Sequence, residues 1–100
     1  LIEAIITVES KGDAKAVSPN GKCCGVLQIT PILVQEVNDI LGSEKYTLQD
    51  RFDREKSIEM FYIMQDAHNP THDMRQAVKI WNRAEWYYKK VMNEYNKTKV

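Results

Sequence analysis

The first ten residues constrain the fold most, because they are apolar on nearly every side and lead into a segment rich in turn residues. Leu1 to Ser10 has the pattern of a helix that is buried all round, although its β-branched residues would also suit a strand. Gly12 predicts the C-terminal cap of this helix. Residues 13–29 contain Ser18-Pro19-Asn20-Gly21 and a further glycine, Gly25, which predict a loop with at most short pieces of regular structure.

The rest of the chain shows four further helix patterns with start and stop signals. The predicted starts are Thr30 with Pro31, Asp53, Thr71 and the region of Glu85; the predicted ends include Gly42 and the residue before Asn69-Pro70. The side chains predicted to face the core are Ile32, Leu33, Val37, Ile40, Leu41, Ile58, Phe61, Tyr62, Met64, Met74, Ala77, Val78, Trp81, Tyr88, Val91, Met92 and Tyr95. Since no repeat or flexible linker interrupts them, the sequence predicts a single all-α domain over residues 1–100.

Composition excludes several classes of protein. A chain of 100 residues has room for one core, and 43% apolar with 28% charged residues is typical of a globular domain. Lys and Arg balance Asp and Glu at fourteen each, so no net field favours nucleic acid or an anionic membrane, and no apolar run is long enough to span a bilayer. The adjacent Cys23 and Cys24 cannot staple distant loops, and they leave the redox compartment undecided.

Glu9 is the first candidate for chemistry. It is a carboxylate at the C-terminal end of the apolar helix, where the helix carries partial negative charge and the neighbours Ile5, Ile6 and Val8 would desolvate it. Both effects raise the pKa of a carboxyl group, which suits a general acid. The alternative is a solvated glutamate that lies near a helix end by chance.

From Glu9 to Pro31 the chain combines a Glu-Ser pair, a Ser-x-x-Gly turn and a Gly-x-x-Gln-Ile run that leads into Thr-Pro. The residues concerned are Glu9-Ser10, Ser18, Gly21, Gly25, Gln28, Ile29 and Pro31, with Val26-Leu27 between Gly25 and Gln28. This stretch resembles the core signature of the soluble lytic transglycosylase (SLT) family, which has a lysozyme-like fold. Val26-Leu27 replaces the Leu-Met pair of that family.

A second segment resembles the same family more weakly. The family carries Ala-Tyr-Asn-Ala-Gly about seventy residues further on, and residues 77–84 read Ala-Val-Lys-Ile-Trp-Asn-Arg-Ala, with Trp81-Asn82 in place of Tyr-Asn. Arg83-Ala84 lacks the glycine that usually follows. In many members the tyrosine places its hydroxyl near the catalytic glutamate, whereas Trp81 can donate only through its indole N–H.

The resemblance implies a lysozyme-like helical domain with an irregular loop after the catalytic helix. It also implies a lytic transglycosylase that cleaves the β-1,4 bond between N-acetylmuramic acid and N-acetylglucosamine in peptidoglycan. Glu9 would protonate the glycosidic oxygen, the acetamido oxygen of the substrate would attack the anomeric carbon, and Glu9 would then take a proton from the 6-hydroxyl as a 1,6-anhydro ring closes. This route uses substrate assistance in place of a second carboxylate, and it needs no cofactor and no metal.

Ser18, Gln28, Trp81 and Asn82 carry over from the resemblance as substrate-binding residues. The alternatives are a turn-forming serine, a glutamine that satisfies the loop backbone and a tryptophan in the core. The implied partner is the peptidoglycan glycan strand, with no nucleic acid and no transmembrane segment, and we expect a monomer. The implied location is the bacterial cell envelope, periplasmic or exported. We expect the targeting segment to be absent from this chain, and the domain to be excised from or flanked by a longer one.

Two other functions stay open. If Asp13, Asp50 or Asp53 supplied a second carboxylate across the sugar, a hydrolytic muramidase of the same fold would be the better interpretation, although Asp53 is explained by helix capping alone. A non-catalytic glycan-binding or envelope-assembly module is favoured by the altered segment 81–85. The intact Glu9 argues against such a module.

Two further patterns are weaker candidates for a functional site. His68 and His72 have the spacing of metal ligands on a helix, but Asn69-Pro70 breaks the helix between them, so no metal site is predicted. The aromatic residues Trp81, Trp86, Tyr87, Tyr88 and Tyr95 could stack on sugars, and about half of them are explained more simply as core.

Overall fold

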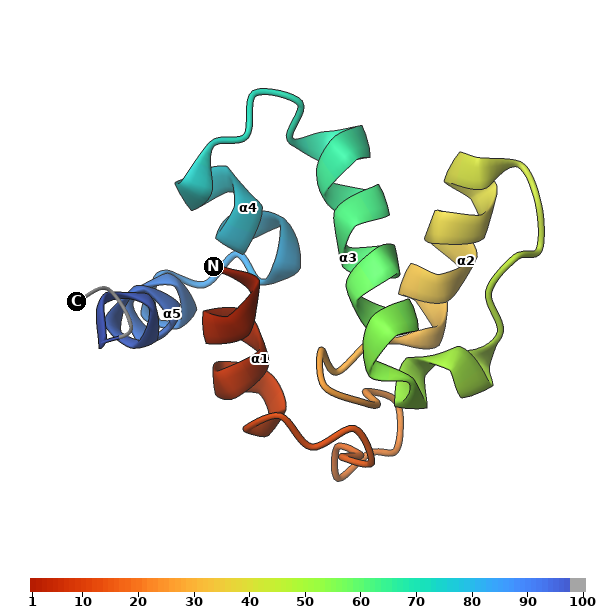
Figure 1. The fold of residues 1–100 in the computed structure, drawn as a ribbon, viewed down its shortest axis with the longest axis horizontal. Coiled ribbons are helices and arrows are strands. Elements are labelled where there is room, and N and C mark those ends of the chain that lie inside the picture. The colour runs from red at the N-terminus through yellow and green to blue at the C-terminus, as the bar shows by residue number, and fades with distance from the viewer. Residues whose placement is uncertain (98–100) are drawn as a thin grey trace.

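The computed structural model describes residues 1–97, whose regular structure is entirely helical (Figure 1). The elements are α1 (Ile2–Ser10), α2 (Pro31–Leu41), the 3-10 helix η1 (Leu48–Phe52), α3 (Arg54–His68), α4 (Met74–Trp81) and α5 (Glu85–Lys97). In this part of the chain extended structure is limited to two isolated bridges, Val17 with Cys24 and Cys24 with Ile29. The all-α prediction is confirmed, and no described helix is both long and apolar enough to cross a membrane.

The helices form two groups that the loop after α1 connects. Helix α1 packs on α5, and α2 packs on α3, while α3 also contacts η1 and α4. Figure 1 shows α2 and α3 together on one side of the molecule, with α1, α4 and α5 on the other. The loop supplies Val26, Leu27 and Ile29 to the core, all nearly inaccessible to solvent. A loop that is anchored by buried side chains can position functional groups as firmly as a helix does.

Five of the predicted helix ends are confirmed, including the end of α3 before Asn69-Pro70 and the start of α5 at Glu85, and two are wrong. Thr30 caps α2 and Asp53 caps α3, each by accepting a backbone N–H, and α2 ends at Gly42 in the left-handed conformation. At the end of α1, however, the cap is Lys11 and not Gly12. Lys11 has φ 56° and donates its N–H to the carbonyl of Thr7, so the chain turns one residue earlier than the glycine predicts.

The prediction that Thr71 caps α4 is also wrong. Asp73 is the cap, and its carboxylate accepts the N–H of Gln76 at 2.7 Å. The reason is Asn69, whose side-chain amide donates to the carbonyl of Asp73 (2.8 Å) and accepts its N–H (3.1 Å). These two bonds fix Asp73 at the entrance of the helix, a local side-chain to backbone effect that the capping propensity of Thr71 does not include.

The predicted core face of α2 is partly wrong. Ile32 is 80% exposed, and Ile40 and Leu41 are also exposed, whereas Val34, Val37 and Asn38 face the core. The side chain of Asn38 accepts the N–H of Tyr46 and donates to its carbonyl, and these bonds turn that face of the helix inward. Tyr62 of α3 and Met74 of α4 are likewise exposed and not in the core.

Gly25 and Arg51 fix the loop against η1. Gly25 has φ 83°, and a Cβ at this position would overlap the carbonyl oxygen of Arg51, so the two backbones touch where a side chain has no room. The buried guanidinium of Arg51 donates to the carbonyls of Lys22 (3.0 Å), Ile29 (3.2 Å) and Leu48 (2.8 Å). One side chain therefore holds both ends of the segment 22–29.

Candidate active site

Glu9 lies in a cleft of about 310 Å³. We call it the Glu9 cleft; its lining residues are Glu9, Ser18, Cys23, Gln28, Thr30, Leu33, Trp81 and Asn82. They come from α1, the loop, the start of α2 and the end of α4. All five residues that the sequence analysis selected for the site therefore meet in one place, although they span 73 positions of the chain.

The carboxylate of Glu9 has a partner that the sequence analysis missed. The hydroxyl of Tyr87 in α5 donates to Glu9 Oε2 at 2.7 Å. Tyr87 is buried, whereas the predicted apolar stripe of this helix ran through its neighbour Tyr88. The available signal was the i, i+4 spacing of Tyr87 and the fully buried Val91, which places both on one face of the helix.

Burial is the largest influence on the pKa of both Glu9 and Tyr87. Desolvation raises the pKa of Glu9, while the hydrogen bond from Tyr87 and the positive charge of Lys90 lower it to a smaller extent. The pKa of Tyr87 is raised by burial first and then by the Glu9 carboxylate, so the phenol stays protonated and remains a donor. The result is a carboxyl group with raised proton affinity and a fixed orientation, as a general acid requires.

The carboxylates considered as second catalytic groups lie elsewhere. Asp13 accepts the N–H of Lys15, Asp50 accepts the N–H of Thr47, and Asp53 caps α3 by accepting the N–H of Lys56. Each is explained by its backbone bond, and Glu9 is the one carboxylate among the eight lining residues of the Glu9 cleft.

Ser18 and Gln28 both hold the loop in shape. The hydroxyl of Ser18 donates to Asn20 Oδ1 (2.6 Å) and accepts the N–H of Cys23 (3.0 Å). Gln28 has φ 52°, and its side-chain nitrogen donates to the carbonyls of Ala16 (3.2 Å) and Gly25 (2.9 Å). The carbonyl oxygen of the Gln28 amide makes no hydrogen bond within the described chain, which leaves it free to accept from a ligand.

Trp81 and Asn82 line the cleft from the end of α4. The indole N–H of Trp81 donates to the carbonyl of Leu27 (3.1 Å), and its ring packs on Phe61 with the centroids 5.1 Å apart. This N–H is therefore not available to Glu9. Asn82 Oδ1 accepts the N–H of Ala84 (3.0 Å), which shapes the short turn before α5.

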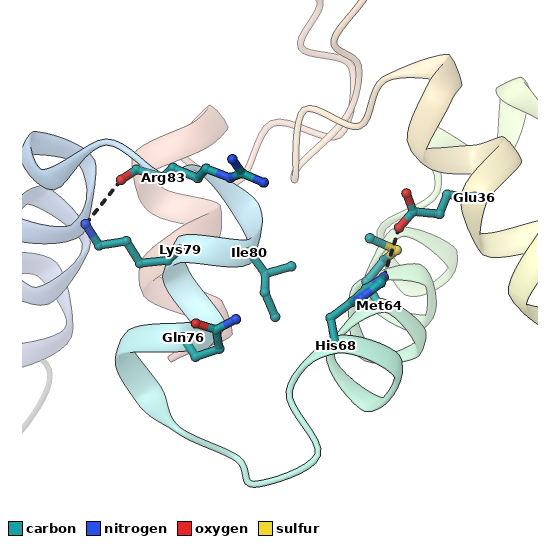
Figure 2. A pocket seen from close by; sticks show the side chains of 7 residues that line it. All are labelled: Glu36, Met64, His68, Gln76, Lys79, Ile80 and Arg83. Atoms are coloured by element: carbon teal, nitrogen blue, oxygen red, sulfur yellow. Dashed lines mark hydrogen bonds and ion pairs between the residues drawn. The ribbon is translucent and has the colours of Figure 1, made fainter.

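A second, larger cleft lies between α4 on one side and α2 and α3 on the other. It measures about 680 Å³ and is lined by Glu36, Met64, His68, Gln76, Lys79, Ile80 and Arg83 (Figure 2). Glu36 lies one turn beyond Leu33 on α2, and Arg83 directly follows Asn82, so the second cleft borders the Glu9 cleft along α2 and the end of α4.

Neither histidine nor cysteine forms a metal centre among residues 1–97. His68 Nε2 lies within hydrogen-bond distance of Glu36 Oε2 (3.0 Å), which links α3 to α2, and His72 is exposed in the turn before α4. Cys23 and Cys24 are both free thiols. Among the described residues, no group of three or more His, Cys, Asp or Glu side chains is placed so that it could hold a metal ion.

Comparison with models of known protein families identifies the family of this chain. The family model described as the transglycosylase SLT domain matches residues 1–99. The chain belongs to the SLT family. Membership agrees with the helical lysozyme-like fold, and in general terms it implies an activity of the lytic transglycosylase type on peptidoglycan in the cell envelope. No curated protein and no solved structure matches this SLT domain significantly.

Proposed function

We propose that this SLT domain is a peptidoglycan lytic transglycosylase that cleaves the β-1,4 bond between N-acetylmuramic acid and N-acetylglucosamine, with Glu9 as its catalytic residue. One observation carries the proposal: Glu9 is held by Tyr87 in a cleft where it is the one carboxylate among the lining residues, and burial raises its pKa. Ser18, Gln28, Trp81 and Asn82 are the proposed substrate-binding residues.

The proposed reaction uses Glu9 twice. The protonated carboxyl group gives its proton to the glycosidic oxygen as the bond from that oxygen to the anomeric carbon breaks. The acetamido oxygen of the same sugar forms a bond to the anomeric carbon and accommodates the charge. The 6-hydroxyl oxygen then displaces it and gives its proton to the Glu9 carboxylate, which closes the 1,6-anhydro ring without water. Each transfer by a positioned acid or base contributes roughly 10²–10⁴ in rate.

Tyr87 fits both steps. Its hydroxyl orients the carboxyl group through one oxygen and leaves the other free to exchange a proton with the substrate. Because Tyr87 is buried and its own pKa is raised, it stays a donor when Glu9 is ionised. We assign it as a positioning residue.

Two other functions could use the same cleft, and one observation bears on each. A hydrolytic muramidase would share the acid Glu9 and let water attack, and the absence of a second carboxylate from the lining residues of the Glu9 cleft argues against it. A glycan-binding module without turnover is favoured by Trp81, whose indole N–H bonds to Leu27 and cannot replace a tyrosine hydroxyl beside Glu9. Tyr87 supplies that hydroxyl from α5, which restores support for an enzyme.

The test is mass spectrometry of purified peptidoglycan after incubation with the wild type, Glu9→Gln and Glu44→Gln. Glu44 is an exposed glutamate that lines neither cleft, so it controls for the loss of one charge. We expect 1,6-anhydro products from the wild type and Glu44→Gln and none from Glu9→Gln. Products with reducing ends would identify the hydrolase, and no products from the wild type would leave the glycan-binding module.

A further inference from the structure

The second cleft is lined by three charged side chains and one histidine, and all but one of the four have partners. Glu36 is paired with His68 on the wall formed by α2 and α3. Lys79 Nζ lies 2.5 Å from Glu85 Oε2 and donates to the carbonyl of Arg83 at 3.1 Å. These bonds neutralise Lys79 and fix the backbone of Arg83 at the end of α4.

The guanidinium of Arg83 is different, because it makes no hydrogen bond or ion pair with another residue of the described chain. Figure 2 shows its side chain extended from the end of α4 into the space between α4 and α2. Its backbone carbonyl is held by Lys79, and the side chain of the preceding Asn82 bonds to Ala84. The backbone of Arg83 is thus fixed, while its guanidinium has no partner in the described chain.

The residues around Arg83 suit a ligand that is mostly neutral and carries one anionic group. The cleft combines the apolar surface of Met64 and Ile80 with this one unpaired cation. An arginine fork matches the geometry of a carboxylate with two parallel hydrogen bonds. A cleft of about 680 Å³ beside the Glu9 cleft has room for sugar rings as well as for the group that carries the carboxylate.

We propose that Arg83 binds a carboxylate on the muramoyl substituent of the glycan strand while the scissile bond lies at Glu9. This inference rests on the proposed function, and it makes Arg83 a determinant of specificity. The sugar rings themselves are uncharged, so the carboxylate comes either from the lactyl group, when the stem peptide has been removed, or from the stem peptide. A neutral glycan lacks both and would leave Arg83 without a partner.

The test measures binding in a Glu9→Gln background, so that no ligand is consumed. Calorimetry compares Glu9→Gln alone with Glu9→Gln combined with Arg83→Gln, Arg83→Lys or Lys89→Gln. Lys89 is an exposed cation of α5 that lines neither cleft, so Lys89→Gln controls for the same change in net charge. The ligands are a peptidoglycan tetrasaccharide with its stem peptides, the same glycan after an amidase has exposed the lactyl carboxylates, the peptide form with its carboxylates amidated, and a neutral chito-oligosaccharide.

We expect Arg83→Gln to weaken binding of a carboxylate-bearing ligand roughly tenfold, Arg83→Lys to weaken it less, and Lys89→Gln to leave it unchanged. The loss should shrink as salt is raised, because the contact is charged and exposed. A loss with the peptide form alone assigns the carboxylate to the stem peptide, and a loss with the amidase-treated form assigns it to the lactyl group.

An equal loss with the amidated or neutral ligands, or no loss with any ligand, would overturn the role of Arg83. Cleavage by the wild type is measured in parallel. If the Arg83 variants bind normally while the wild type cleaves peptidoglycan, the role of Arg83 is wrong and the proposed function stands. If charge-dependent binding is found without cleavage, the proposed function is wrong and Arg83 is a ligand residue of a binding module. If no ligand binds, the role of Arg83 is wrong, and if the wild type also fails to cleave peptidoglycan, the proposed function is wrong as well.

Discussion

The hydroxyl of Tyr87 lies 2.7 Å from the carboxylate of Glu9, so the last helix of the structure holds a side chain of the first. Helices α1 and α5 pack against each other, and this packing brings the two residues together. The pair determines both the proton affinity and the orientation of Glu9, and each property gives a separate prediction.

Replacing Tyr87 with Phe removes the hydrogen bond and keeps the buried ring. We expect peptidoglycan cleavage to fall roughly tenfold to a hundredfold, because a misplaced acid transfers its proton less efficiently. The bond lowers the pKa of Glu9, so its loss raises that pKa further. Since Glu9 must begin each turnover protonated, the alkaline limb of the kcat/KM profile should move to higher pH. Tyr88→Phe is the matched control, because Tyr88 faces Arg75 and not Glu9; an unchanged profile in Tyr87→Phe would contradict the positioning role.

The raised pKa of Glu9 also makes stability depend on pH. In the window between its ordinary pKa and the raised value, the folded state binds more protons than the unfolded state. The contribution of Glu9 to stability is therefore fully present below the ordinary pKa and is lost as pH rises through the raised one. Glu9→Gln mimics the protonated group, so it should melt several degrees above the wild type at pH 8, with a smaller gain at pH 4. Thermal denaturation at both pH values measures this, with Glu44→Gln as control, and a gain that does not grow with pH would contradict the prediction.

Gly25 is predicted to be the least replaceable glycine. Gly25→Ala adds a Cβ that overlaps the backbone carbonyl of Arg51, and neither backbone can move without breaking the loop. We expect a loss of at least roughly 3 kcal/mol in the free energy of unfolding. Gly21→Ala is the matched control, because Gly21 also has positive φ (75°) and has no atom within 4 Å of the added Cβ; it should cost about 1 kcal/mol. Chemical denaturation measures both variants, and equal losses in the free energy of unfolding would show that the close contact with Arg51 does not add to the cost of Gly25→Ala.

Arg51 should contribute to stability far more than an exposed arginine. Arg51→Met leaves the carbonyls of Lys22, Ile29 and Leu48 without the guanidinium, and an unsatisfied buried polar group costs about 1–3 kcal/mol. We expect a loss of roughly 3 kcal/mol, with faster amide exchange in the segment 22–29. Arg54→Met removes an exposed ion pair with Glu3 and should change stability by less than about 1 kcal/mol. Similar losses from the two variants would refute the anchoring role.

Local signals predicted most of the fold, and together with the family resemblance they selected five of the eight residues that line the Glu9 cleft. Thr30 and Asp53 cap helices through bonds to residues three positions away, and such short-range rules are readable in the sequence. Glu9 was predicted for the same kind of reason, since its helix and its apolar neighbours are local. The end of α1 at Lys11 shows that even these rules locate a boundary only to within a residue.

The errors share a physical cause, which is contact between a helix and residues outside it. Asn38 turns α2 because it bonds to Tyr46, and Asn69 displaces the cap of α4 from Thr71 to Asp73. Tyr87 was missed because its role depends on α1, 78 residues earlier in the chain. Periodicity describes one helix at a time, so it cannot distinguish Tyr87 from Tyr88 without the partner helix.

The packing of α1 on α5 has a consequence for how the site is made. A ribosome produces Glu9 78 residues before Tyr87, so the nascent chain carries the acid for the whole of that interval without the hydroxyl that orients it. The wall residues Trp81 and Asn82 also emerge late. The cleft is thus assembled by the final helices, and chains that are interrupted before α5 hold every residue of the loop signature but no oriented acid.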